Sequence, residues 1–113
     1  MGSDITGDVN DDQFGKLGCV SITQDGLTVA VSALGYDKDG ITDRGLVRVY
    51  NHDLTIDTWK QIGSDLVGDN SSDNFSKTAF SSDGLFLSVG AMGGKYVKIF
   101  EKIESNYEMI GRR

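Results

Sequence analysis

The sequence predicts an all-β chain built from two similar units, and three observations favour this class. Fifteen glycines and no proline, set among clusters of Asp, Asn and Ser, indicate many tight turns. Short β-branched or aromatic runs separate these clusters, and no segment shows a helical period. Landmarks also recur in order at a spacing of about 50 to 60 residues, which is typical of repeat architectures.

The repeat is seen in pairs of matching segments. These pairs are 2–8 with 63–69, 12–14 with 73–75, 25–27 with 83–85, 29–33 with 87–91, 47–50 with 97–100, and 59–63 with 107–111. Units of this kind bury their apolar faces against their neighbours. The repeat therefore predicts architecture more than chemistry.

In the first unit, apolar runs predict strands at 19–23, 27–33, 46–51 and 58 to about 62. The dipeptide Asp25-Gly26 lies between the first two runs, where a tight hairpin turn needs positive φ. Apolar and polar residues alternate in Val47–Tyr50, so one face of that strand is apolar.

In the second unit, the corresponding runs are 78–81, 85–91, 96–101 and 107–110, with Asp83-Gly84 at the first turn. The connection from Ala91 to Tyr96 is shorter than that from Leu34 to Gly45, which places the variable surface on the first unit. Four antiparallel strands joined by hairpins describe a β-propeller blade. We expect residues 1–15 to be the exit of a preceding outer strand and a loop, 16–66 the first blade, and 67–113 the second.

Aromatic residues recur at equivalent positions of the two units. Recurrence of this kind favours packing between blades over stacking on a ligand. The residues are Phe14, Tyr50, Trp59, Phe75, Phe100 and Tyr107.

Two known repeat families resemble parts of this pattern. The segment 79–91 followed by 97–100 looks like the middle of a WD-type blade, without that family's Gly-His and Trp-Asp pairs. The whole repeat is closer to the FG-GAP-like propeller repeats of large secreted or cell-surface proteins, which Phe14-Gly15, Asp25-Gly26 and the segments 29–33, 45–50 and 59–63 resemble. The resemblance implies an extracellular or cell-surface location, with the cytoplasm as the alternative, and a role in adhesion.

The two ends of the chain are complementary in this scheme. Residues 2–7 match the exit of an outer strand, and residues 107–111 match the first half of one. We expect either a piece of a longer propeller or copies that join head to tail into a ring of about six to eight blades. The expected partners are therefore other blades or copies of this chain, with a protein or glycan ligand as a further partner.

Charge and composition bear on the remaining partner classes. The net charge of −6 and the scattered basic residues argue against nucleic acid. No apolar stretch is long enough for a membrane span, so we expect no membrane insertion. Cys19 is the single cysteine, which excludes an internal disulfide and favours a small buried side chain.

Two acidic loops have spacings that suit calcium. Asp37, Asp39 and Asp43 surround a glycine, and Asp8, Asn10 and Asp12 alternate as oxygen ligands do in a calcium loop. Integrin-type FG-GAP blades bind calcium in Asp-rich loops, so the resemblance implies the same cofactor here. The alternatives are an acidic hairpin loop at 37–43 and ordinary Asx turns at 8–12.

Other candidate positions lie in predicted loops. Tyr36, Asp37, Lys38 and Asp39 form the predicted ligand or partner loop, because Tyr36 has no counterpart in the second unit. Asn70 and Asn74 begin glycosylation sequons, which matter only in a secretory pathway. The second unit repeats the acidic spacing as Asp69, Ser71 and Asp73, and the single histidine, His52, is expected in a surface turn.

We see no nucleophile, base and orienting group that converge, so we expect a chain that is not an enzyme. The favoured function is a non-catalytic propeller module that acts as a structural, adhesion or protein-interaction scaffold. The first alternative is a calcium-dependent module for a carbohydrate or protein ligand, and the second is a fragment of a propeller enzyme.

Overall fold

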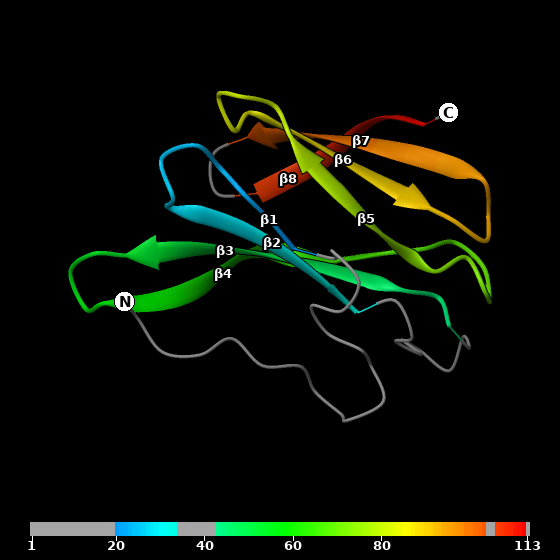
Figure 1. The fold of residues 1–113 in the computed structure, drawn as a ribbon, viewed down its shortest axis with the longest axis horizontal. Helices are drawn as coiled ribbons and strands as arrows, with labels where there is room; N and C mark the ends of the chain where they lie inside the picture. The colour runs from blue at the N-terminus through cyan, green and yellow to red at the C-terminus, as the bar shows by residue number, and fades with distance from the viewer. Residues whose placement is uncertain (1–19, 34–42, 104–105, 113) are drawn as a thin grey trace.

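The computed structural model describes residues 20–33, 43–103 and 106–112, and these residues form two four-stranded antiparallel sheets (Figure 1). The described residues contain no helix, and so none that could cross a membrane. In each sheet the strands are hydrogen-bonded in chain order. The first sheet contains β1 (Val20–Ile22), β2 (Thr28–Ala33), β3 (Leu46–Asp53) and β4 (Thr58–Val67), and the second contains β5 (Phe75–Phe80), β6 (Phe86–Ala91), β7 (Tyr96–Ile103) and β8 (Asn106–Arg112). The all-β prediction is confirmed.

The strands fall where the apolar runs predict them, but several are longer. β4 continues to Val67 instead of ending near Ile62, because a bulge lets the pairing resume after an irregular step. The registers on either side of this bulge are Val49 opposite Ile62 and Val47 opposite Leu66. Gly63 lies in the bulge with φ of 73°. The pairing of β7 with β8 has its own irregularity between Ile99 and Phe100, one step along the repeat from the irregularity in the first sheet.

The turn between β1 and β2 is closed by side-chain hydrogen bonds. The Thr23 hydroxyl donates to Asp25 Oδ1 over 2.7 Å, and the Leu27 N–H donates to the same oxygen over 2.9 Å. The Thr28 N–H donates to the Thr23 hydroxyl over 3.2 Å. Gly26 has φ of 74°, as predicted from the Asp-Gly dipeptide.

The turn between β5 and β6 repeats these contacts atom for atom. The Ser81 hydroxyl and the Leu85 N–H donate to Asp83 Oδ1 over 2.7 and 3.0 Å, and the Phe86 N–H donates to the Ser81 hydroxyl over 3.0 Å. Gly84 has φ of 75°. The repeat seen in the sequence is therefore also a repeat of local hydrogen bonding.

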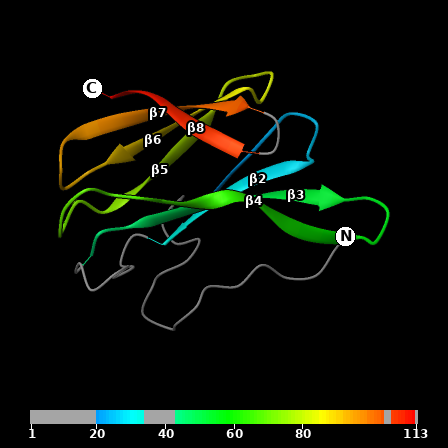
Figure 2. The same cartoon turned by 180° about the vertical axis from the view of Figure 1, so that it is seen from behind.

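The two sheets pack face to face, as both views show (Figures 1 and 2). β5 lies against β1, β2 and β3, while β8 lies against β4. Between the sheets is one apolar core, to which the first sheet contributes Ala30, Val47, Val49 and Leu66 and the second contributes Phe75, Leu87, Val89, Ala91, Tyr96, Phe100 and Tyr107. Three of the recurring aromatic residues thus pack between the units, as predicted.

Polar contacts also join the sheets. The Ser21 hydroxyl donates to Thr78 Oγ1 over 2.9 Å, and the Ser32 hydroxyl donates to the Ser76 carbonyl over 2.8 Å. Gly45 has φ of 84°, and a Cβ on it would collide with the backbone of Phe75. The chain before β3 therefore runs directly against the start of β5.

Candidate functional site

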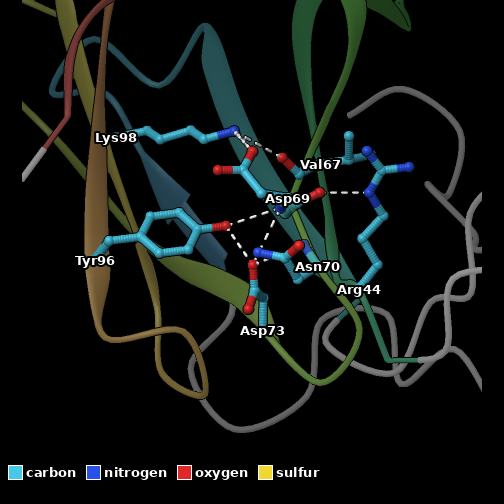
Figure 3. A network of polar contacts seen from close by, with 8 residues as sticks. Arg44, Val67, Asp69, Asn70, Asp73, Tyr96 and Lys98 are labelled. Atoms are coloured by element: carbon cyan, nitrogen blue, oxygen red, sulfur yellow. Dashed lines mark hydrogen bonds and ion pairs between the residues drawn. The ribbon is translucent and has the colours of Figure 1, made fainter.

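The segment 68–74, here called the crossover, carries the chain from β4 of the first sheet to β5 of the second, and a polar network holds it (Figure 3). At its centre is Asp73, whose exposed fraction is 4%. Asp73 Oδ2 accepts the backbone N–H groups of Asp69 over 3.1 Å and of Asn70 over 2.9 Å. The carboxylate therefore folds the crossover back on itself.

Tyr96, at the start of β7, ties this loop to the second sheet. Its hydroxyl donates to Asp73 Oδ2 over 2.6 Å and accepts the Asp69 N–H over 2.8 Å. Burial, followed by the hydrogen bond to Asp73, raises the pKa of Tyr96 to about 12. The hydroxyl thus stays a donor to the carboxylate throughout the neutral range.

Lys98 supplies the cation of the network. Its Nζ lies 2.7 Å from Asp69 Oδ1, donates to the Val67 carbonyl over 3.3 Å, and lies 5.3 Å from the centre of the Phe75 ring. On the other side of the crossover, Arg44 Nε donates to the Gly68 carbonyl. Side chains from the second sheet and from the segment before β3 therefore hold the crossover.

The acidic spacing at Asp69, Ser71 and Asp73 suggested calcium ligands, but the two carboxylates have protein partners here. Asp69 faces the Lys98 ammonium, and Asp73 accepts two N–H groups and a phenol. Within residues 20–33, 43–103 and 106–112, no group of three His, Cys, Asp or Glu side chains is arranged to hold a metal ion. The network acts as a structural clasp between the sheets.

Of the remaining predicted site residues, three lie among the residues that the structure describes. Asp43 is exposed, with φ of 51°, and its carbonyl accepts the Asn74 N–H over 3.0 Å. Asn70 is exposed on the crossover, whereas Asn74 is half-buried. The other candidates lie outside the described residues, and these are Asp8, Asn10, Asp12, Tyr36, Asp37, Lys38 and Asp39.

His52 departs from its expected place in a surface turn. β3 extends to Asp53, so His52 is paired with Trp59 in the ladder, and its side chain is only 4% exposed. Its Nε2 lies 2.7 Å from Asp57 Oδ1, and its ring centre lies 5.0 Å from that of Trp59. Nδ1 is buried and has no hydrogen-bond partner among the described residues.

A hollow of about 430 Å³ lies along the paired strands β3 and β4 and includes His52 in its lining. No motif in the sequence indicated it, because its lining comes from two strands joined by a hairpin. The lining residues are Asn51, His52, Asp53, Lys60, Gln61, Ile62 and Gly63.

The two Asp-Gly turns meet at one end of the molecule. Thr23, Gln24 and Asp25 of the first turn line a hollow of about 330 Å³ together with Ser82 and Asp83 of the second. Hydrogen bonds, led by that from Thr23, hold the pKa of Asp25 below its ordinary value of 3.8, and the Leu85 N–H leads the same effect on Asp83. The sequence predicted each turn but not their contact.

Some exposed apolar side chains lie on the outward faces of the sheets. On the first sheet Val20 and Ile22 are 48% and 58% exposed. On the second sheet Phe86, Val97 and Ile103 are exposed. The strand registers place these three on the face opposite the core residues Leu87 and Phe100.

No protein-family model matches the chain, and neither a curated protein nor a solved structure matches it. Functional proposals for this chain therefore depend on its own geometry.

Proposed function

We propose that this chain is a non-catalytic β-propeller repeat module whose two sheets are consecutive blades of a structural scaffold. The observation that carries the proposal is a repeated packing face. The first sheet buries one face against the second, and the second sheet presents the equivalent residues on its outward face. A module of this kind acts by adding blades, because each blade covers the apolar face of its neighbour.

The two equivalent faces differ mainly in whether a neighbour covers them. Val47 of the first sheet is fully buried, whereas its counterpart Val97 is 36% exposed. Val49 is buried, whereas its counterpart Ile99 is half-buried. The second sheet therefore keeps the apolar side chains of a packing face with no described segment packed over Val97.

The opposite side of the chain has the complementary feature. Ile22 of β1 corresponds to Phe80 of β5, because Thr23 and Ser81 occupy the same position in the two turns. Phe80 packs against the core between the sheets, whereas Ile22 is 58% exposed. On that face of the first sheet the edge strand β1 is exposed, whereas Val29 and Val31 of the neighbouring strand are buried. The open apolar face for a further blade is therefore that of the second sheet.

The geometry offers no comparable support for catalysis. The one histidine is nearly buried, and its close partners are Asp57 and Trp59. Calcium binding through Asp37, Asp39 and Asp43 remains a prediction, as does a role outside the cell. A calcium titration of wild type and Asp43→Ala, read by calorimetry, tests the first of these.

A tandem fusion of two copies tests the proposed function without requiring separate molecules to associate. The fusion creates one new junction between the second sheet of copy one and the first sheet of copy two. Because stacked repeats stabilise their neighbours, we expect the fusion to unfold at a higher temperature than the single chain at low protein concentration.

The fusion contains its own matched control. Val97→Asp in copy one places a carboxylate at the junction and should remove the gain, while the same substitution in copy two lies at the free end and should leave it. If the unmodified fusion unfolds at the temperature of the single chain, the blades do not stack and the proposal is wrong.

A further inference from the structure

We propose that this chain forms a two-fold dimer in which the outward face of the second sheet packs against the same face of a second copy. This surface is called the open face here, and its central residues are Ala79, Phe86, Ser88, Val97 and Ile99. The inference goes beyond the proposed function, because it concerns the chain when no further blade covers that face.

The centre of the open face is apolar and hollowed. Phe86 is 38% exposed and Val97 is 36% exposed, although both lie in the two middle strands of the sheet, β6 and β7. A hollow of about 230 Å³ lies on this face, and Ala79, Ser88 and Ile99 contribute to its wall. Exposed apolar side chains around a hollow are typical of the centre of a protein interface.

Three charged side chains at the corners of the open face lack a partner among the described residues. Lys77 is exposed at one corner, on β5, whereas Glu101 of β7 and Glu108 of β8 are opposite each other at the other corner. No hydrogen bond or ion pair within the described part of the chain involves these three side chains. The strand registers separate Lys77 from Glu108 by about 13 Å along the strands and about 14 Å across them, so the two cannot pair within one chain.

The charged corners fit those of a second copy. A two-fold rotation about a diagonal axis in the plane of the open face lays Lys77 of each copy on Glu101 and Glu108 of the other. Each ammonium then lies beside two carboxylates, which offsets the repulsion that the acidic pair has in the single chain. A surface that is complementary to itself in this way is what a two-fold interface requires.

The same rotation brings large side chains of one copy onto small side chains of the other. By the strand registers, Phe86 of one copy lies over Ala79 of the other, at the hollow. Ile99 lies over Ser88 and Gly90, and Val97 lies near the axis, where the two copies of this valine meet. Large residues that face small ones allow the two sheets to interdigitate.

The acidic pair belongs to the open face and is not a general feature of the repeat. At the equivalent place the first sheet has Asn51 opposite Lys60, where the second has Glu101 opposite Glu108. The first sheet is covered there by the second sheet of the same chain. The change to two carboxylates on the open face therefore favours a partner that brings a cation, as a second copy does through Lys77.

The first sheet offers a second copy no comparable surface. On its outward face, Val29, Val31 and Ala33 are at most 7% exposed, and only the edge strand β1 has accessible apolar side chains. Each copy therefore contributes its own open face. Contact through one shared face uses that face up in both copies, so the assembly stops at two chains.

Charge reversal in two complementary variants tests the dimer by native mass spectrometry. Lys77→Glu places a carboxylate on the acidic pair of the other copy, and the double variant Glu101→Lys with Glu108→Lys places two ammonium groups on its lysine. Each variant alone should dimerise at least about tenfold more weakly than wild type. An equimolar mixture, with one variant isotopically labelled, should form a heterodimer as readily as wild type dimerises, because both contacts then join opposite charges.

Lys60→Glu is the matched control, because it makes the same change of charge at an exposed lysine of the first sheet. It should keep the wild-type dissociation constant. If the double variant loses its far-ultraviolet circular dichroism spectrum, Glu108→Lys alone replaces it. That substitution separates dimerisation from folding, since it should stabilise the single chain by removing a repulsion and yet weaken the dimer.

Several results would overturn the inference. These are a wild type with the mass of one chain or of more than two, a Lys77→Glu variant with wild-type affinity, and a mixture that gives no heterodimer. A dimer that is lost with Val97→Asp but unchanged by the charge reversals would use the open face in another orientation and would overturn it too. The tandem fusion is measured at low protein concentration, so a monomeric wild type leaves the proposed function standing, and an unstabilised fusion leaves the dimer standing.

Discussion

Tyr96 is the residue that connects the crossover most directly to the second sheet. Its hydroxyl is both a donor, to the Asp73 carboxylate, and an acceptor, from the Asp69 backbone. Tyr107, the other core tyrosine, makes a single hydrogen bond, to the Gly84 carbonyl over 2.7 Å. The two phenols provide a comparison within one molecule.

We expect Tyr96→Phe to destabilise the protein more than Tyr107→Phe. A hydrogen bond to a charged group contributes about 1.5–3 kcal/mol and a neutral one about 0.5–1.5 kcal/mol. Unfolding in urea, followed by the fluorescence of Trp59, measures both losses. Equal losses of stability in the two variants would mean that the two backbone N–H donors are sufficient to stabilise the Asp73 carboxylate.

From the same phenols we predict how the stability of the folded chain falls at alkaline pH. Burial is the main cause that raises the pKa of Tyr96 and of Tyr107 from 10.0 to about 12. The contribution of the two phenols to the free energy of unfolding is fully present below pH 10, where they are protonated in the folded and in the unfolded chain. It is lost as the pH rises through about 12. Absorbance at about 295 nm should show two late-titrating tyrosines, and ionisation of all tyrosines near pH 10 would contradict this.

At the scale of elements, the two Asp-Gly turns contribute to how the stability of the protein depends on acidic pH. The pKa of Asp25 and of Asp83 lies below 3.8 because each carboxylate accepts a hydroxyl and a backbone N–H. Each therefore stabilises the folded chain above that pH and loses this contribution as the pH falls through its lowered pKa.

We expect the double variant Asp25→Asn with Asp83→Asn to show a weaker fall in thermal midpoint below pH 3.8 than wild type. The amide oxygen keeps an acceptor for Leu27 and Leu85 but does not titrate. Melting curves at several acidic pH values measure the difference. If the thermal midpoints of the two proteins fall equally with pH, the two turns do not contribute to the loss of stability in acid.

The pairing of β7 with β8 contains an unfavourable pair. Glu101 and Glu108 are directly opposite each other, and like charges in this position repel. We expect Glu108→Lys to raise the free energy of unfolding by about 0.2–1 kcal/mol, with Glu108→Gln between it and wild type. Urea unfolding at low protein concentration measures this, and a Lys variant no more stable than the Gln variant would rule out an attractive pair.

The sequence was sufficient for the strands and their turns because these depend on neighbours in the chain. The Asp-Gly turns and the alternation in β3 and β7 are local signals. The clasp was not predictable in the same way, since Asp73 and Tyr96 are 23 residues apart and no spacing rule joins them. The prediction that His52 lies in a surface turn was wrong for a local reason, because β3 continues two residues beyond the predicted end at Asn51.

At the scale of the whole molecule, Phe75 lies in the core that the two sheets share. It is fully buried, and its ring meets that of Phe100 edge to face, with centres 6.4 Å apart. We expect Phe75→Ala to cost about 3–5 kcal/mol and to lower the stability of both sheets together in a single transition. Calorimetry checks this, and two separate transitions would mean that the sheets unfold independently.

The chain-order pairing of the strands has a consequence for synthesis on the ribosome. The backbone ladders of the first sheet need no residue beyond Val67. That sheet can form while the second is still being made, but Val47 and Val49 then face water until β5 to β8 arrive to cover them. The interval between the two sheets is therefore when the nascent chain is most exposed to aggregation, and when a chaperone that binds apolar strands would matter most.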